Sequence, residues 1–165
     1  MTTLTTTRLK VADEVWIAAA LLHRERPASP DFSIDEIVAR AQRENIHGSL
    51  RPGVYVHTIQ HCVANRPPNP ARYRMLIETV SGRRRIFRRG DAYHPDREGG
   101  KITPDAKDMP QGYLDLLTWY EEWCLAMAKT GLLRDPLLSL AGSGRKLWAD
   151  EHADDYVRRL RENWE

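Results

Sequence analysis

An arginine cluster in the middle of the chain could bind a phosphate backbone. Five arginines fall within seven positions: Arg83, Arg84, Arg85, Arg88 and Arg89. Each guanidinium carries a permanent charge and can donate paired hydrogen bonds to a phosphate. This density exceeds what is needed to protect a strand edge from aggregation. We therefore expect these arginines to point outward and to contact phosphates in a salt-dependent way, with a merely solvated strand as the alternative.

The segment before this cluster, RPGVYVHTIQHCVAN at 51–65, has the pattern of a helix that could read DNA bases. Val56, Ile59 and Val63 recur at helical spacing and would face a core. The remaining polar and aromatic side chains would form the outer face: Arg51, Tyr55, His57, Thr58, Gln60, His61 and Asn65. Amide side chains pair well with adenine, and arginine pairs with guanine. The alternative is a solvated helix face without a ligand.

Two other arrangements carry weaker chemical signals. His57 and His61 stand four residues apart, a spacing that can hold a metal, but no third ligand lies nearby. Asp96, Glu98 and Lys101 have the residue types of an acid–acid–lysine nuclease site, but two glycines separate Glu98 from Lys101. No serine or cysteine has a setting typical of a catalytic triad. We predict a protein that is not an enzyme and has no catalytic residues, metal or cofactor.

The composition indicates a soluble globular chain. Of the 165 residues, 29% are charged and 41% are hydrophobic. No apolar run approaches the roughly 18 residues that a membrane-spanning helix needs. Cys62 and Cys124 lie among apolar neighbours, which favours two buried thiols over a disulfide. These features predict a cytoplasmic protein with no membrane partner.

The charges are distributed unevenly along the chain. Residues 66–101 contain 10 Lys and Arg against 4 Asp and Glu, whereas residues 102–165 contain 8 against 12. A basic middle can meet phosphates, while an acidic C-terminal part suits a protein partner or the rest of its own chain.

The order of expected elements is three helices, a hairpin, a long helix and a tail. The first helix covers about 13–24, and the second begins at a capping box formed by Ser33 and Glu36. After the third helix, residues 73–78 alternate, with Met75 and Ile77 on one face and Leu76 on the other. This order predicts a mainly α fold with a small β-hairpin, in the form of a winged helix-turn-helix with a long C-terminal helix and an extended helical tail.

The C-terminal half divides at a glycine-containing joint. The helix at 110–131 has a broad apolar stripe, which needs a partner: either the back of the preceding domain or a second copy in a dimer. The predicted organisation is a loose leader at 1–11, a winged-helix domain at 12–90, a loop at 91–109, the long helix at 110–131 and a partner-binding tail at 132–165.

Two parts of the chain resemble known families. The part from Val15 to Arg89, with FSIDEIVARA and RRRIFRRGD, resembles the small winged-helix modules of bacterial restriction and regulatory proteins. This resemblance implies that the third helix enters the major groove of double-stranded DNA and that the hairpin follows the phosphates or the minor groove.

The tail, DPLLSLAGSGRKLWADEHADDYVRRLRENW, looks like the C-terminal region of VapB-type antitoxins, which neutralise PIN-domain ribonuclease toxins. The resemblance implies that the tail wraps a toxin and that one basic side chain reaches the acidic metal site of that toxin. The implied contact residues are Arg145, Lys146, Leu147, Trp148, Tyr156, Arg158, Arg159, Leu160 and Trp164, and Arg161 is a further candidate for the neutralising charge.

Together these features predict a DNA-binding antitoxin and transcriptional regulator of a type II toxin–antitoxin system. The symmetry of operator sites favours a homodimer. The alternative is a winged-helix adaptor that binds protein or DNA in a restriction or defence system, and a small nuclease is the third reading.

Overall fold

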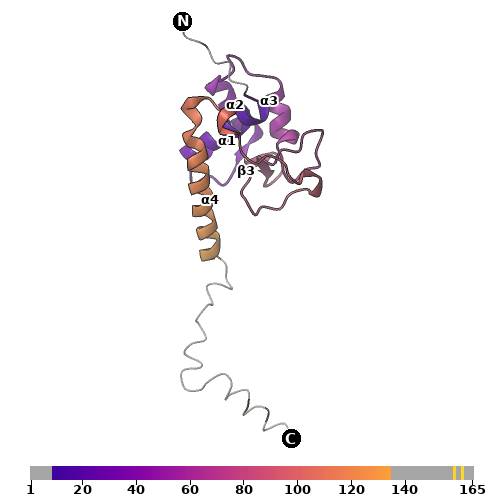
Figure 1. Cartoon of the computed structure of the whole chain (residues 1–165), viewed down its shortest axis with the longest axis vertical. Coiled ribbons are helices and arrows are strands. Elements are labelled where there is room, and N and C mark those ends of the chain that lie inside the picture. Colours follow the sequence, from indigo (N-terminus) through magenta and orange to yellow (C-terminus); the bar gives the residue numbers. More distant parts are fainter. Residues whose placement is uncertain (1–8, 135–157, 159–160, 162–165) are drawn as a thin grey trace. The chain divides into compact units, whose positions relative to one another are not determined.

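Helix α1 (Val11–Glu25) lies at the centre of the first of two compact units, and every residue from Ala12 to His23 is buried. The computed structural model describes residues 9–134 together with Arg158 and Arg161 (Figure 1). The chain divides into the units Met1–Cys124 and Leu125–Glu165, each of which is described by itself. Helix α1 contacts α2, α3, η1 and β3, so apolar side chains cover it on several sides. The alanines at 18–20 let these elements approach closely.

Helix α2 (Ile34–Glu44) begins where its capping box predicts. The Ser33 hydroxyl accepts a hydrogen bond from the Glu36 backbone N–H at 3.1 Å, and the Glu36 carboxylate accepts one from the Ser33 N–H at 2.8 Å. These bonds satisfy two backbone donors that a helix start leaves free. The helix buries Ile37 and Ala41 against the core, and its C-cap is Asn45, whose φ of 50° is left-handed.

The third helix differs from the prediction in its register. Helix α3 (Gly53–Val56) continues directly into a π-helical segment, η1 (His57–His61). The buried positions follow a spacing of four, Val54, Thr58 and Cys62, and Val63 is buried as predicted. The expectation that Val56 faces the core is therefore wrong, since this residue is 40% exposed. Thr58, expected on the outer face, is fully buried.

The predicted hairpin is present as part of a three-stranded antiparallel sheet. The strands are β1 (Phe32–Ser33), β2 (Leu76–Glu78) and β3 (Arg83–Ile86), in the order β1–β3–β2. Leu76 pairs with Ile86, and both are buried. The expected alternation is wrong at Leu76, because it shares the core with its neighbour Met75, which precedes the strand. The chain is thus mainly α-helical with a small sheet, as predicted.

After the sheet, the chain runs through three short 3-10 turns into a long helix. The turns are η2 (Pro95–Arg97), η3 (Ala106–Asp108) and η4 (Gln111–Tyr113). They lead to α4 (Asp115–Arg134). In the first unit, Leu116 and Tyr120 of this helix are buried, and the Tyr120 ring meets Trp16 of α1 edge-on at 5.6 Å between centroids. This part of the apolar stripe therefore packs on the core of the same chain. Among the described residues, no helix is long and apolar enough to cross a lipid bilayer.

Candidate binding surface of the third helix and the hairpin

Two buried arginines, Arg84 and Arg97, close the C-terminal end of η1. The last carbonyl groups of a helix have no partner within the helix and need donors from elsewhere. Of the last four carbonyls of η1, the first two accept hydrogen bonds from Arg84 at 3.2 and 3.4 Å. The other two accept hydrogen bonds from Arg97 at 2.9 Å each. The four acceptors belong to Thr58, Ile59, Gln60 and His61. Positive charge at this end also complements the helix dipole.

Arg97 binds the following loop as well as the helix. It donates to four more backbone carbonyls at 2.6 to 3.3 Å, those of Arg66, Pro67, Ala71 and Tyr73. Its side chain is fully buried, and no ion pair with a carboxylate is formed within the described part of the chain. Burial lowers the pKa of the Arg97 guanidinium. The carbonyl oxygens therefore take the place of the water that a charged group loses on burial.

The arginines of the hairpin do not all point outward, which corrects the prediction from sequence. Arg84 is 1% exposed, because it alternates with Ile86 on the inner face of β3. This face of the central strand lies against η1, whose carbonyls accept its hydrogen bonds. Its charge is also near Glu78, at 3.4 Å. Arg84 is thus a part of the core and has no exposed surface for a phosphate.

The other hairpin arginines are paired with carboxylates. Arg83 meets Asp31 at 2.5 Å. Arg85 makes a two-pronged contact to Asp91 at 2.6 and 2.8 Å. Although burial alone raises the pKa of Asp91, its hydrogen bonds to Arg85 and to the Arg88 backbone hold that pKa below its usual value. Asp91 is therefore ionised near neutral pH and compensates the charge of Arg85.

The end of the arginine run is more open. Arg88 lies over the Trp123 ring at 5.7 Å and is 4.0 Å from Asp91. Arg89 pairs with Glu121 at 3.0 Å, and its side chain is 66% exposed. An exposed pair of this kind holds its partners weakly, so Arg89 can exchange Glu121 for a phosphate.

Most of the predicted base-reading side chains of the third helix are bound within the protein. The Thr58 hydroxyl donates to the Val54 carbonyl at 2.8 Å. The Gln60 amide donates to the Pro67 carbonyl at 2.7 Å. Asn65 is exposed, but its amide exchanges two hydrogen bonds of 2.9 Å with the Glu78 backbone. These groups position the loop and β2 and have little freedom to read a base.

His57 and Arg51 are also hydrogen-bonded within the protein, whereas Nδ1 of His61 is buried with no hydrogen-bond partner among the described residues. Nδ1 of His57 lies 2.9 Å from the Gly53 carbonyl, and burial lowers the pKa of this half-buried ring. The rings of His57 and His61 meet at 4.8 Å between centroids. Arg51 pairs with the buried Glu14 at 2.6 Å and donates to the Leu9 carbonyl. Within the described ranges, no group of three or more His, Cys, Asp or Glu could hold a metal ion.

The outer surface of α3 is apolar instead of polar. Tyr55 is 52% exposed, Val56 40% and the preceding Leu50 36%. Of these, Tyr55 alone was among the predicted site residues. Val56 was missed because the apolar spacing assigned it to the buried side, where Val54 lies instead. Leu50 precedes the helix and has no periodic pattern. We call Leu50, Tyr55 and Val56 the α3 apolar surface.

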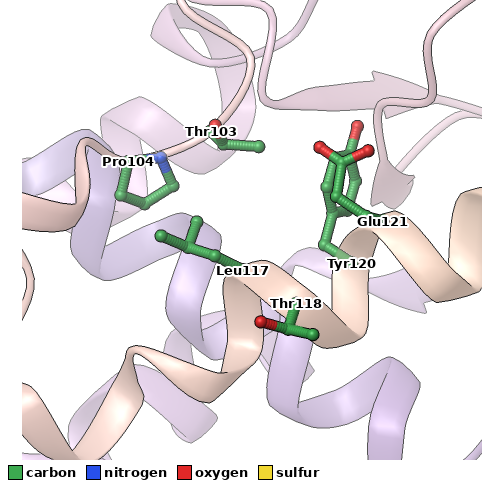
Figure 2. Close-up of a pocket in the computed structure, with 6 residues that line it drawn as sticks. All are labelled: Thr103, Pro104, Leu117, Thr118, Tyr120 and Glu121. Carbon is green, nitrogen blue, oxygen red and sulfur yellow. The ribbon is translucent and has the colours of Figure 1, made fainter.

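A shallow pocket of about 320 Å³ lies between the loop at Thr103–Pro104 and helix α4 (Figure 2). The loop faces Leu117 and Tyr120 of the helix. Tyr120 donates its hydroxyl hydrogen to the Phe87 carbonyl at 2.6 Å, so this hydroxyl is already committed. The titratable residues of the lining are Tyr120 and Glu121, and Glu121 pairs with Arg89 at 3.0 Å.

Most residues of the predicted partner-binding tail lie outside the described residues. These are Arg145, Lys146, Leu147, Trp148, Tyr156, Arg159, Leu160 and Trp164. Arg158 and Arg161 are described, and both are helical and exposed.

Comparisons with models of protein families, with curated proteins and with solved structures found no match to this chain.

Proposed function

We propose that this chain is a non-catalytic binding protein, the antitoxin of a toxin–antitoxin pair, with an N-terminal winged helix that contacts protein. Three helical segments followed by a hairpin is the order expected of a winged helix-turn-helix, and the order α1, β1, α2, α3, β2, β3 supports it. The toxin-binding role rests on the resemblance of the tail to VapB-type antitoxins.

The observation that carries the protein-binding role of the winged helix is the α3 apolar surface. A helix that reads DNA needs free donors and acceptors for base edges, with cations beside them for phosphates. Here hydrogen bonds within the protein occupy the side chains of Thr58, Gln60 and Asn65. Tyr55 and Val56 are the exposed residues of α3 itself. Exposed aromatic and aliphatic side chains are typical anchors of protein interfaces.

Co-expression with the product of the adjacent reading frame tests the proposal. The tagged full-length chain should retain that product on an affinity column, and deletion of residues 142–165 should abolish retention. The double variant Tyr55→Asp/Val56→Asp should reduce retention at least about tenfold if the α3 apolar surface also contacts the toxin. Val80→Asp is the matched control, because Val80 is 59% exposed at the hairpin turn.

The outcomes separate the two parts of the proposal. Full retention by the truncated chain would refute the toxin-binding role of the tail. Unchanged retention by the Tyr55→Asp/Val56→Asp variant would exclude α3 as a contact to this partner. Circular dichroism of each variant distinguishes lost binding from lost folding.

A second candidate function is binding of double-stranded operator DNA through the hairpin and the loop before it. The specific observation in its favour is that Arg89 is highly exposed, while the exposed Arg72 forms no ion pair with any described residue. Residues 66–101 also carry six more positive than negative charges, 10 against 4.

Fluorescence anisotropy with duplex DNA of the chain's own promoter, measured over a range of salt concentrations, tests this second function. Replacing Arg89 or Arg72 by Gln should each reduce the slope of log affinity against log salt by about one. Absence of salt-dependent binding by the wild-type chain would rule out the repressor role and leave the protein-binding role untouched.

A further inference from the structure

Helix α2 presents a polar surface to solvent, away from the side that packs on α1. The exposed residues of this helix are Asp35, Ala39, Gln42 and Arg43. At about 100° per residue, these positions fall on one side of the helix, opposite the buried Ile37 and Ala41. We call these four exposed residues the α2 surface.

The other charged side chains of α2 have partners within the same unit. Glu36 pairs with Arg26 at 2.8 Å. Arg40 pairs with Glu44 at 2.8 Å and with Glu25 at 2.7 Å. These pairs neutralise the charges that lie toward the body of the protein.

Asp35 and Arg43 differ from the rest of the helix. Neither forms a hydrogen bond or ion pair through its side chain with any residue in 9–134. Their signs suit the helix dipole, with the acid in the first turn and the base in the last. The same arrangement leaves one negative and one positive charge at opposite ends of an exposed surface.

These two charges are placed symmetrically about Ala39. Each is four residues away from it, or about 6 Å along the helix axis. A second α2 that runs antiparallel, related by a two-fold axis beside Ala39, would therefore set Asp35 of one copy level with Arg43 of the other, twice. The small side chain of Ala39 lets two helices approach to about 8 Å. A parallel arrangement in register would instead oppose like charges.

We propose that the α2 surface binds a second copy of this chain, and that the two copies form an antiparallel, two-fold symmetric contact centred on Ala39. The occupant is a second copy because the surface is complementary in charge to itself. One helix pair buries less than the about 1,200 Å² typical of stable interfaces, so the dimer forms at high protein concentration and weakens as salt is added. The contact uses neither the α3 apolar surface nor the tail. A failed test of this contact therefore does not affect the proposed function, and a failed test of the proposed function does not affect this contact.

Charge reversal in the full-length chain tests the contact by sedimentation equilibrium, with protein at concentrations up to about 1 mM. The variants Asp35→Arg and Arg43→Asp should each weaken self-association at least about tenfold, because each homodimer would hold two like-charge pairs. An equimolar mixture of the two variants should regain the dimer, since both cross-pairs then have opposite signs. Glu122→Arg, a similar charge change at an exposed position of α4, should leave the affinity unchanged.

Three results would overturn the proposal. One is a wild-type chain that stays monomeric throughout this range. Another is self-association that neither reversal weakens. The last is a mixture that fails to regain what the separate variants lost. If either reversal disturbs the far-ultraviolet circular dichroism, Ala39→Arg replaces it, because an exposed alanine can be enlarged without altering the core; retention of the dimer in this variant also overturns the proposal.

Discussion

Arg84 and Arg97 together bind the last four backbone carbonyls of η1. Arg84 donates to the first two of these, and Arg97 donates to the last two. One arginine comes from the central strand, and the other from a 3-10 turn beyond the sheet. The two side chains therefore tie the third helix to the sheet and to the loop that follows. Their charges contribute to the stability of the fold, which is a different role from phosphate binding.

Replacing Arg97 by Met should lower the free energy of unfolding by about 3–5 kcal/mol, because several buried carbonyls lose their donor. Urea unfolding followed by circular dichroism measures the change. Arg72→Met is the matched control: Arg72 is exposed, so its substitution should stay within about 0.5 kcal/mol. Equal effects of the two substitutions would contradict the role assigned to Arg97.

Arg84 and Arg89 should respond differently to the same change. Substitution of Arg84 by Met should reduce stability by about 2–3 kcal/mol, since it removes a buried hydrogen-bonded cation. Substitution of Arg89 should change stability by less than about 1 kcal/mol, because its pair with Glu121 is exposed. Thermal unfolding of both variants checks this order, and a reversed order would show that Arg84 is not a core residue.

Gly100 lies where no side chain fits. A Cβ atom at this position would stand 1.8 Å from the Arg72 carbonyl oxygen and 2.9 Å from that of Arg97. Because both neighbours are backbone atoms, Gly100→Ala should force the two loops apart and reduce stability by more than about 2 kcal/mol. Gly112→Ala, where nothing lies within 4 Å, should be nearly neutral in the same unfolding measurement.

The buried His23 should make stability depend on pH. Its Nε2 accepts a hydrogen bond from the Ile86 N–H, and burial, with Arg85 and Arg88 nearby, lowers its pKa from 6.5 to about 4. As the pH falls, His23 takes up its proton in the unfolded chain before it does so in the folded protein. Neutral His23 therefore contributes its full stability above pH 6.5, and this contribution is lost as the pH falls toward 4. The loss should be on the order of 3 kcal/mol.

The variant His23→Gln isolates this effect from that of the carboxylates. Its free energy of unfolding should be lower than that of the wild type at pH 7, and the difference should shrink between pH 6.5 and 4. A difference that stays constant over this window would show that His23 does not titrate as its surroundings require.

Local signals predicted the elements that depend on local chemistry. Ser33 and Glu36 placed the start of α2 because a capping box is complete within four residues. The apolar stripe of α4 likewise carries its information in nearby residues. Strand β1 was not predicted, because Phe32 and Ser33 pair with a strand about 50 residues away and leave no periodic pattern.

The candidate site was harder to predict, because a charged residue type does not reveal its partner. The hairpin would have the same arginine-rich sequence whether its arginines faced a phosphate, as predicted, or a helix end, as Arg84 does. No sequence pattern indicates the role of Arg97, since it is an isolated arginine in an expected loop. The third helix also has a different register from the one expected, so that Thr58 is buried and Val56 is exposed.

The central position of α1 has a consequence for synthesis on the ribosome. Tyr120, whose ring packs against Trp16 of this helix, is made about 100 residues after it. At about 5–20 residues per second, the part of α1 that Tyr120 covers waits roughly 5–20 s for its partner in every nascent chain. A chain that stops before α4 therefore leaves the Trp16 side of α1 exposed, and chaperones and proteases can recognise such an apolar surface.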